Sequence, residues 1–104
     1  MIDWTRVVGF DWDPGNARKN ADKHSVSQAG TEQVFFNEPL LLVPDHQHSQ
    51  LELRLHGLGT TDDGRLLHVT FTLRSAQTLI RVISARGMHR KERTLYEQTT
   101  QERS

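Results

Sequence analysis

The feature that most constrains the fold is an alternation of apolar and polar residues on both sides of one turn sequence. Before the turn, leucines occupy every second position from Leu51 to Leu55, and after it apolar residues do the same from Leu67 to Leu73. Successive side chains of a β-strand point to opposite faces, so this spacing predicts two strands that each bury one face. The Asp63-Gly64 pair between them is a strong hairpin signal. The segment therefore predicts an antiparallel hairpin with one apolar and one polar face.

Two further apolar runs extend this hairpin. Residues 40–43 precede it, and residues 79–86, rich in β-branched and aliphatic side chains, follow it after a short link at 75–77. Four consecutive strands with short links favour an antiparallel meander. One face of such a sheet can stay open to a ligand. A shorter strand is predicted near the N-terminus, at residues 7–12.

Three helices are predicted around this meander. Asp13-Pro14 has the form of an N-cap followed by proline at the first helical position, which predicts a helix over residues 14–24. Ser27 is the next plausible N-cap and predicts a second helix over about residues 28–36. After the break at Gly87, a stripe of residues three or four apart, Met88, Lys91, Leu95 and Gln98, predicts a third helix over about residues 88–98. The predicted fold class is α+β: a small antiparallel meander with two N-terminal helices and one C-terminal helix, all packed on one face of the sheet.

Length and composition define a single domain over residues 1–104. A chain of 104 residues can form one core of two layers, over about residues 7–98, followed by a polar tail at 99–104. There are no cysteines, which excludes disulfides, thiol catalysis and cysteine-based zinc sites. No apolar run approaches the roughly 18 residues of a membrane helix, and the N-terminus lacks the pattern of a signal peptide. We therefore expect a cytoplasmic protein that binds no membrane.

The neutral net charge conceals an uneven distribution. Residues 1–63 contain five Lys or Arg and ten Asp or Glu, whereas residues 64–104 contain eight and three, so the two parts carry about −5 and +5 charges. A chain without an overall positive excess has little reason to bind nucleic acid indiscriminately, but a basic patch can hold a few phosphates. The alternative is that these charges pair internally.

Arginines mark the polar face of the predicted sheet. Arg54, Arg74 and Arg81 lie on three neighbouring strands. On the last helix Arg93 and Tyr96 are three residues apart, so both can point to the same place. The structural alternative for this helical pair is that Arg93 pairs with a carboxylate while Tyr96 closes the core.

Several motifs form an ordered set over about residues 10–97. They are, in chain order, Phe10-Asp11-Trp12-Asp13, Asn20, Lys23-His24-Ser25-Val26-Ser27, Val34-Phe35 before Pro39, Arg54, Gly64-Arg65-Leu66-Leu67, Thr72-Leu73-Arg74, Arg81-Val82-Ile83-Ser84-Ala85-Arg86, and Glu92-Arg93 with Tyr96. This set resembles the BrnT family of toxins. The chain departs from the family pattern at Ser25, where glycine is usual, and at Leu55, where an aromatic residue is frequent.

The resemblance implies a toxin of a type II toxin–antitoxin pair, with a fold similar to the RelE ribonucleases. It also implies an endoribonuclease that cleaves RNA and arrests translation. The implied partner is a BrnA-like antitoxin, whose ribbon-helix-helix region binds promoter DNA while the rest of it covers the toxin. The implied complex contains two toxins and two antitoxins, and the toxin reaches promoter DNA only through the antitoxin.

The arginines suit cleavage of RNA without a metal or cofactor, in which the 2′-hydroxyl attacks the adjacent phosphate. Cations must stabilise the additional charge around phosphorus, and the guanidinium fork can engage two phosphate oxygens. Arg74 and Arg81 are the predicted transition-state cations. Arg54 and Arg93 are expected to orient the RNA backbone, and Tyr96 to stack on a base or to bind a phosphate. The further RNA-binding candidates are Lys23, His24, Arg86 and Arg90.

Alternatives remain open for these residues. His24 can cap a helix end, and Arg86 can anchor the last helix through an ion pair. Histidines are the natural groups for proton transfer, but neither base nor acid is assigned. The family usually has an aliphatic residue at the position of His56, and the resemblance therefore argues against His56 as an essential base. The basic face as a whole could be a non-catalytic module that receives a protein partner. A metal-dependent hydrolase is the third possibility, built on His46 and His48 of a polar loop.

Overall fold

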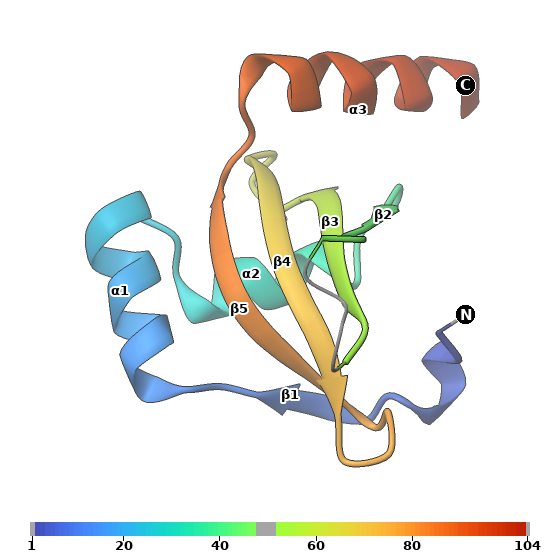
Figure 1. Ribbon diagram of the computed structural model, residues 1–104. Coiled ribbons are helices and arrows are strands. Elements are labelled where there is room, and N and C mark those ends of the chain that lie inside the picture. Colours follow the sequence, from blue (N-terminus) through green and yellow to red (C-terminus); the bar gives the residue numbers. More distant parts are fainter. Residues whose placement is uncertain (1, 48–51, 104) are drawn as a thin grey trace.

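The computed structural model describes residues 2–47 and 52–103 (Figure 1). Its elements are η1 (Trp4–Arg6), β1 (Gly9–Asp11), α1 (Pro14–His24), α2 (Gln28–Val34), β2 (Leu41–Pro44), β3 (Arg54–Thr60), β4 (Leu66–Arg74), β5 (Leu79–Gly87) and α3 (Arg90–Arg103). The predicted α+β class is confirmed. α2 ends two residues earlier than expected, and α3 continues through the polar segment to Arg103. Within the described ranges, no helix is both long and apolar enough to cross a membrane.

The strands form one mixed sheet in the order β1-β5-β4-β3-β2. β2 pairs antiparallel with β3, β3 with β4, and β4 with β5, so the predicted meander is confirmed. β1 is added at the edge, parallel to β5, with Gly9 opposite Leu79 and Asp11 opposite Arg81. The alternation pattern does not predict this parallel pairing, because the pairing joins segments that are far apart in the chain.

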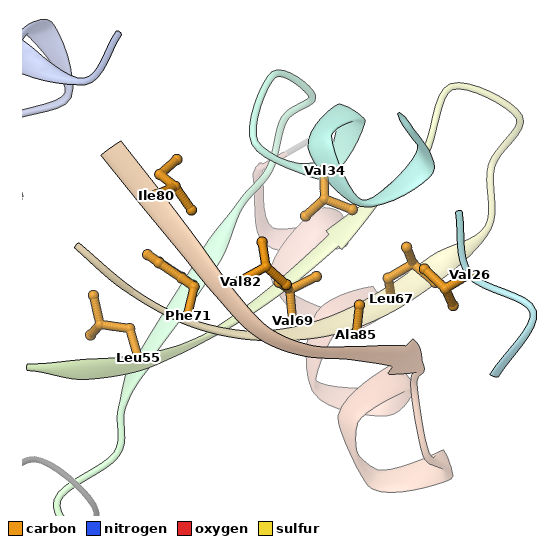
Figure 2. Packing of buried hydrophobic residues seen from close by; sticks show 9 residues of the cluster. All are labelled: Val26, Val34, Leu55, Leu67, Val69, Phe71, Ile80, Val82 and Ala85. Atoms are coloured by element: carbon orange, nitrogen blue, oxygen red, sulfur yellow. The ribbon is translucent and has the colours of Figure 1, made fainter. Parts of the chain in front are cut away.

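The main core lies on the face of the sheet that α2 covers (Figure 2). Alternate residues of β3, β4 and β5 point into it, and Phe71, Val69 and Val82 are fully buried. Gly59 lets α2 approach β3 closely, because a Cβ at this position would lie 2.5 Å from Val34 Cγ1. The absence of a side chain there therefore allows the helix to pack on the strand.

α1 runs along the outer edge of β5, beyond its short pairing with β1 (Figure 1). The helix begins at the predicted cap, where the Asp13 side chain accepts hydrogen bonds from the backbone N–H groups of Gly15 and Asn16. Farther along, the buried Asn20 side chain accepts a hydrogen bond of 3.3 Å from the backbone N–H of Ala85. This bond satisfies a donor on the strand edge that would otherwise be unpaired.

α3 packs on the opposite face from α2, which corrects the prediction that all three helices share one face. Tyr96 and Met88 form a second buried cluster with Leu58 of β3. Leu58 is the neighbour of Gly59, whose Cβ position faces α2, so the side chain of Leu58 points to the other side of the sheet. Figure 1 shows α3 lying across one end of the strands. The rest of this second face carries polar side chains, and it is called the polar face below.

Candidate functional site

The polar face carries a row of residues from three adjacent strands. Arg54 on β3 lies opposite Thr72 on β4, and Thr72 lies opposite Arg81 on β5. Because neighbouring strands are about 4.8 Å apart, the Cα atoms of the two arginines are separated by about 10 Å. Thr72 is 1% exposed and donates a hydrogen bond to the carbonyl of Leu53. The two arginines therefore flank a buried threonine on one surface.

A β-bulge brings Arg86 to the same face as Arg81. These arginines are five positions apart, a spacing that places two side chains of a regular strand on opposite faces. The pairing of β4 with β5 shifts register beside Thr70, which leaves Ile83 as an extra residue in β5. Arg86 consequently lies opposite His68 on the polar face.

Arg81 and Arg74 are paired with partly exposed carboxylates. Arg81 Nη1 is 3.2 Å from Asp11 Oδ1, and its Nη2 is 3.4 Å from Asp13 Oδ2. Arg74 Nη2 is 3.2 Å from Glu52 Oε1. The five side chains retain between 25% and 47% of their surface, so water screens these pairs and each contributes about 0–1 kcal/mol to stability. An RNA phosphate can replace the carboxylates at small cost.

Arg86 anchors α3 through an ion pair, which is the structural role that the sequence left open for it. Its Nη1 and Nη2 atoms donate to Oε1 and Oε2 of Glu92 at 2.8 and 2.9 Å. Glu92 also accepts a hydrogen bond of 2.8 Å from the backbone N–H of His89 at the start of the helix. The hydrogen bonds from Arg86 lower the pKa of Glu92 to about 2. This pair fastens α3 to the sheet and occupies the guanidinium group that was predicted to bind RNA.

Arg93 and Tyr96 point to different surroundings although they are three residues apart. Tyr96 is 4% exposed, packs against Leu58 and Met88, and donates a hydrogen bond of 2.7 Å to the carbonyl of Pro39. Arg93 is exposed on the outer side of the helix. Tyr96 therefore packs in the core, as the structural interpretation of this helical pair predicts. Its burial does not support contact with RNA.

Replacing Tyr96 by phenylalanine is expected to lower the free energy of unfolding by about 1 kcal/mol, because the Pro39 carbonyl loses its donor while the packing of the ring is kept. Urea denaturation of the two proteins checks this value. A variant that keeps its stability but loses RNA cleavage would mean that the Tyr96 hydroxyl acts on the substrate.

The remaining RNA-binding candidates lie outside the arginine row. Lys23 is exposed in the last turn of α1, and Arg90 is exposed in the first turn of α3. His24 is half-buried at the end of α1, and its backbone carbonyl accepts a hydrogen bond of 2.9 Å from Arg65. The structure therefore gathers the strand arginines on the polar face and leaves these three residues on the helices.

Two histidines occupy the middle of the polar face. His56 Nδ1 is 2.9 Å from Thr70 Oγ1, and His56 Nε2 is 3.2 Å from Asp45 Oδ2. The rings of His56 and His68 lie against each other with centroids 4.8 Å apart. The alternation in β3 and β4 predicts the face of both histidines. It does not predict the contact with Asp45, which follows β2 in a loop.

His68 is a neutral, largely buried side chain. Burial, together with the positive charge of Arg86, lowers the pKa of His68 to about 4 against the opposing effect of Glu92. The Nε2 atom of His68 is 3.7 Å from Glu92 Oε2. Its Nδ1 atom is buried and has no hydrogen-bond partner within the described part of the chain. The imidazole is therefore uncharged at neutral pH.

We expect the protein to lose stability in two stages on acidification. The unfolded chain protonates His68 near pH 6.5 but the folded protein only near pH 4, so the contribution of His68 is complete above pH 6.5 and is lost between these values. The contribution of Glu92 is lost at lower pH, between 4.5 and about 2. Denaturation midpoints measured across this pH range should show both decreases in the wild-type protein. In a His68→Phe variant the decrease between pH 6.5 and about 4 should be absent, and the decrease at lower pH should remain. An unchanged first stage in that variant would contradict the assignment.

A metal centre has no visible basis in the described ranges. No three His, Cys, Asp or Glu side chains within residues 2–47 and 52–103 are grouped so that they could hold a metal ion. His46 is exposed, and His48 lies outside the described residues. The alternative that uses His46 and His48 therefore stays a prediction.

Comparison with known proteins identifies the family. The family model described as the ribonuclease toxin BrnT of type II toxin–antitoxin systems matches residues 12–92. This match places the chain among the toxins of type II toxin–antitoxin systems. Within that class the chain belongs to the BrnT family of ribonuclease toxins, so the family resemblance is confirmed.

A solved structure supports the fold. The crystal structure of the Brucella abortus ribonuclease toxin BrnT is similar to this chain with a TM-score of 0.62 and 20% sequence identity, over 81% of this chain and 100% of that chain. At this identity the likeness establishes the fold alone, and the RelE-like label stays a prediction. No curated protein matches the sequence.

Proposed function

We propose that this chain is an endoribonuclease that needs no metal ion, cleaves RNA through attack of the 2′-hydroxyl on the adjacent phosphate, and thereby arrests translation in the cytoplasm. The observation that carries the proposal is the row in which Arg54 and Arg81 flank the buried Thr72. Membership of a ribonuclease toxin family supplies the reaction class.

The row fits the charge that develops during this reaction. As the 2′-oxygen bonds to phosphorus and the bond to the 5′-oxygen breaks, negative charge accumulates on the non-bridging oxygens. Arg81 can exchange its carboxylate partners for these oxygens, and Arg54 approaches the same phosphate from the opposite side. The sequence predicts Arg74 as the second transition-state cation, but Arg74 lies beyond this row, opposite Leu79, so we assign it instead to a neighbouring phosphate. Arg93 on α3 is left to orient the RNA backbone.

The proposed protein partner is a BrnA-like antitoxin that covers the polar face, in a complex of two toxins with two antitoxins. The carboxylates already paired with Arg74 and Arg81 support this choice, because they are the kind of group that an acidic antitoxin segment would supply. Such a segment would compete directly with RNA phosphates. Promoter DNA is left to the ribbon-helix-helix region of the antitoxin.

Expression of the chain with and without its neighbouring reading frame tests this function. Alone, the chain is expected to stop growth and to fragment cellular RNA. Both effects should disappear when the antitoxin is produced with it. Intact RNA in arrested cells would refute the nuclease proposal.

A second candidate is a non-catalytic binding module. The observation that favours it is that Arg74, Arg81 and Arg86 each have a carboxylate within 3.4 Å, as arginines that receive a protein partner would. In that case the purified chain binds the antitoxin but leaves RNA uncut.

A further inference from the structure

The contacts of His56 define which of its ring nitrogens is basic. Asp45 is only 9% exposed at its side chain, and an ionised carboxylate can only accept hydrogen bonds. In a neutral ring, Nε2 therefore carries the proton and donates a hydrogen bond to Asp45, and the lone pair remains on Nδ1. The hydroxyl of Thr70 then donates to Nδ1. This carboxylate, imidazole and hydroxyl follow one another in the order by which proteins activate a hydroxyl group.

We propose that His56 is the catalytic residue that takes the proton from the RNA 2′-hydroxyl, and that Asp45 is its positioning residue. The inference rests on the proposed function, since it assigns the base of the same cleavage reaction. It goes beyond the arginine row by naming the group that starts the attack.

The location of His56 suits this step. His56 follows Arg54 by two residues on the same face of β3, a distance of about 7 Å along the strand. A phosphate held between Arg54 and Arg81 would place its ribose over the next row of the sheet, which contains His56 and Thr70. The His56 side chain is 28% exposed, so part of the ring faces solvent.

The cleft beside His56 gives room for a nucleotide. It has a volume of about 240 Å³ and is bounded by apolar side chains of β2, β3 and α3 together with His56, His68 and Glu92. The neutral ring of His68 forms part of its wall and lies tilted against His56 without adding a charge. Among the charged groups around His56, Asp45 contacts it from the loop after β2, and Arg54 precedes it by two residues on the same face of β3. The pair of Arg86 and Glu92 lies beyond His68.

The proposed step conserves atoms and protons. After the Thr70 hydroxyl turns away from Nδ1 of His56, this nitrogen takes the proton of the 2′-hydroxyl. The 2′-oxygen forms a bond to phosphorus, and the bond between phosphorus and the 5′-oxygen breaks. Water protonates the departing 5′-oxygen and later accepts the proton from His56. The products are a 2′,3′-cyclic phosphate and a 5′-hydroxyl.

The test compares His56→Gln with His89→Gln, which alters an exposed histidine at the start of α3. The His56 variant is expected to cleave a short RNA at least about 100-fold more slowly and to lose the dependence of the rate on pH that a general base confers. The control is expected to retain both. Thermal unfolding of each variant verifies that the loss is not a loss of fold.

Two further measurements distinguish catalysis from structural support. Added imidazole should partly restore cleavage by His56→Ala, because it can enter the space left by the side chain. Asp45→Asn should lower kcat and leave KM nearly unchanged, because a positioning residue acts through His56. If the wild-type protein cleaves RNA but folded His56→Gln keeps its rate and pH profile, this inference fails while the proposed function stands. A wild-type protein that leaves RNA intact overturns both.

Discussion

Replacing Arg81 by alanine is expected to slow RNA cleavage by about 100- to 1,000-fold, the usual effect of removing one group that stabilises developing charge in a transition state. Arg81 Nη1 and Nη2 lie 3.2 and 3.4 Å from partly exposed carboxylates of Asp11 and Asp13, so the guanidinium can turn to a phosphate without leaving a buried charge unpaired. Single-turnover rates on a defined RNA give the value. Arg81→Lys should retain part of the activity, because lysine keeps the charge and lacks the planar fork.

The matched control is Arg18→Ala, which removes an exposed arginine from α1 and should leave the cleavage rate unchanged. Loss of the two Arg81 ion pairs should change the free energy of unfolding by no more than about 2 kcal/mol. A folded Arg81→Ala protein with the wild-type rate would remove this residue from the mechanism. A rate lost together with the fold would require the comparison to be repeated with the lysine variant.

Replacing Phe71 by alanine is expected to lower the free energy of unfolding by about 3–5 kcal/mol. Phe71 is completely buried at the centre of the main core, and its ring meets Phe35 edge-on with centroids 5.0 Å apart. The substitution removes this packing and leaves a cavity between the sheet and α2. Because small domains are stable by only about 5–15 kcal/mol, the variant should be close to unfolding at ordinary temperature.

Phe36→Ala is the control for this prediction. Phe36 is the next aromatic residue after Phe35 but is 77% exposed, so its replacement should change stability by less than about 0.5 kcal/mol. Urea denaturation of both variants measures the difference. Similar losses for the two would mean that the core is not centred on Phe71.

Local patterns predict the central part of the fold. Alternation in β3 and β4 gives the correct faces of Arg54 and Phe71, and the hairpin turn places Gly64 at a φ of +87°, which glycine adopts without strain. The parallel pairing of β1 with β5 depends on contacts between distant segments, for which the sequence carries no periodic signal. The face chosen by α3 depends on the cluster of Met88 and Tyr96 with Leu58, and helical spacing alone does not specify it.

In the candidate site, as in the fold, local patterns predict the positions on regular strands but not the contacts that depend on bulges, loops or helix packing. Regular alternation suffices to place Arg54 and Arg74 on one face. It does not place Arg81 and Arg86 together, because their common face requires a bulge in β5. Helical spacing brings Arg93 near Tyr96, but the burial of Tyr96 depends on how α3 is rotated against the sheet. The approach of Asp45 to His56 depends on a loop, which has no period to interpret.

The most direct measurement of the arginine-based mechanism is the chemical form of the ends produced when purified protein cuts RNA in excess EDTA. Attack by the 2′-hydroxyl leaves a 2′,3′-cyclic phosphate on one fragment and a 5′-hydroxyl on the other, and mass spectrometry distinguishes these ends from others. We predict these ends, at a rate that the chelator does not change and that Arg81→Ala lowers by about 100- to 1,000-fold. Cleavage that stops in EDTA, or fragments that carry a 5′-phosphate, would contradict the mechanism.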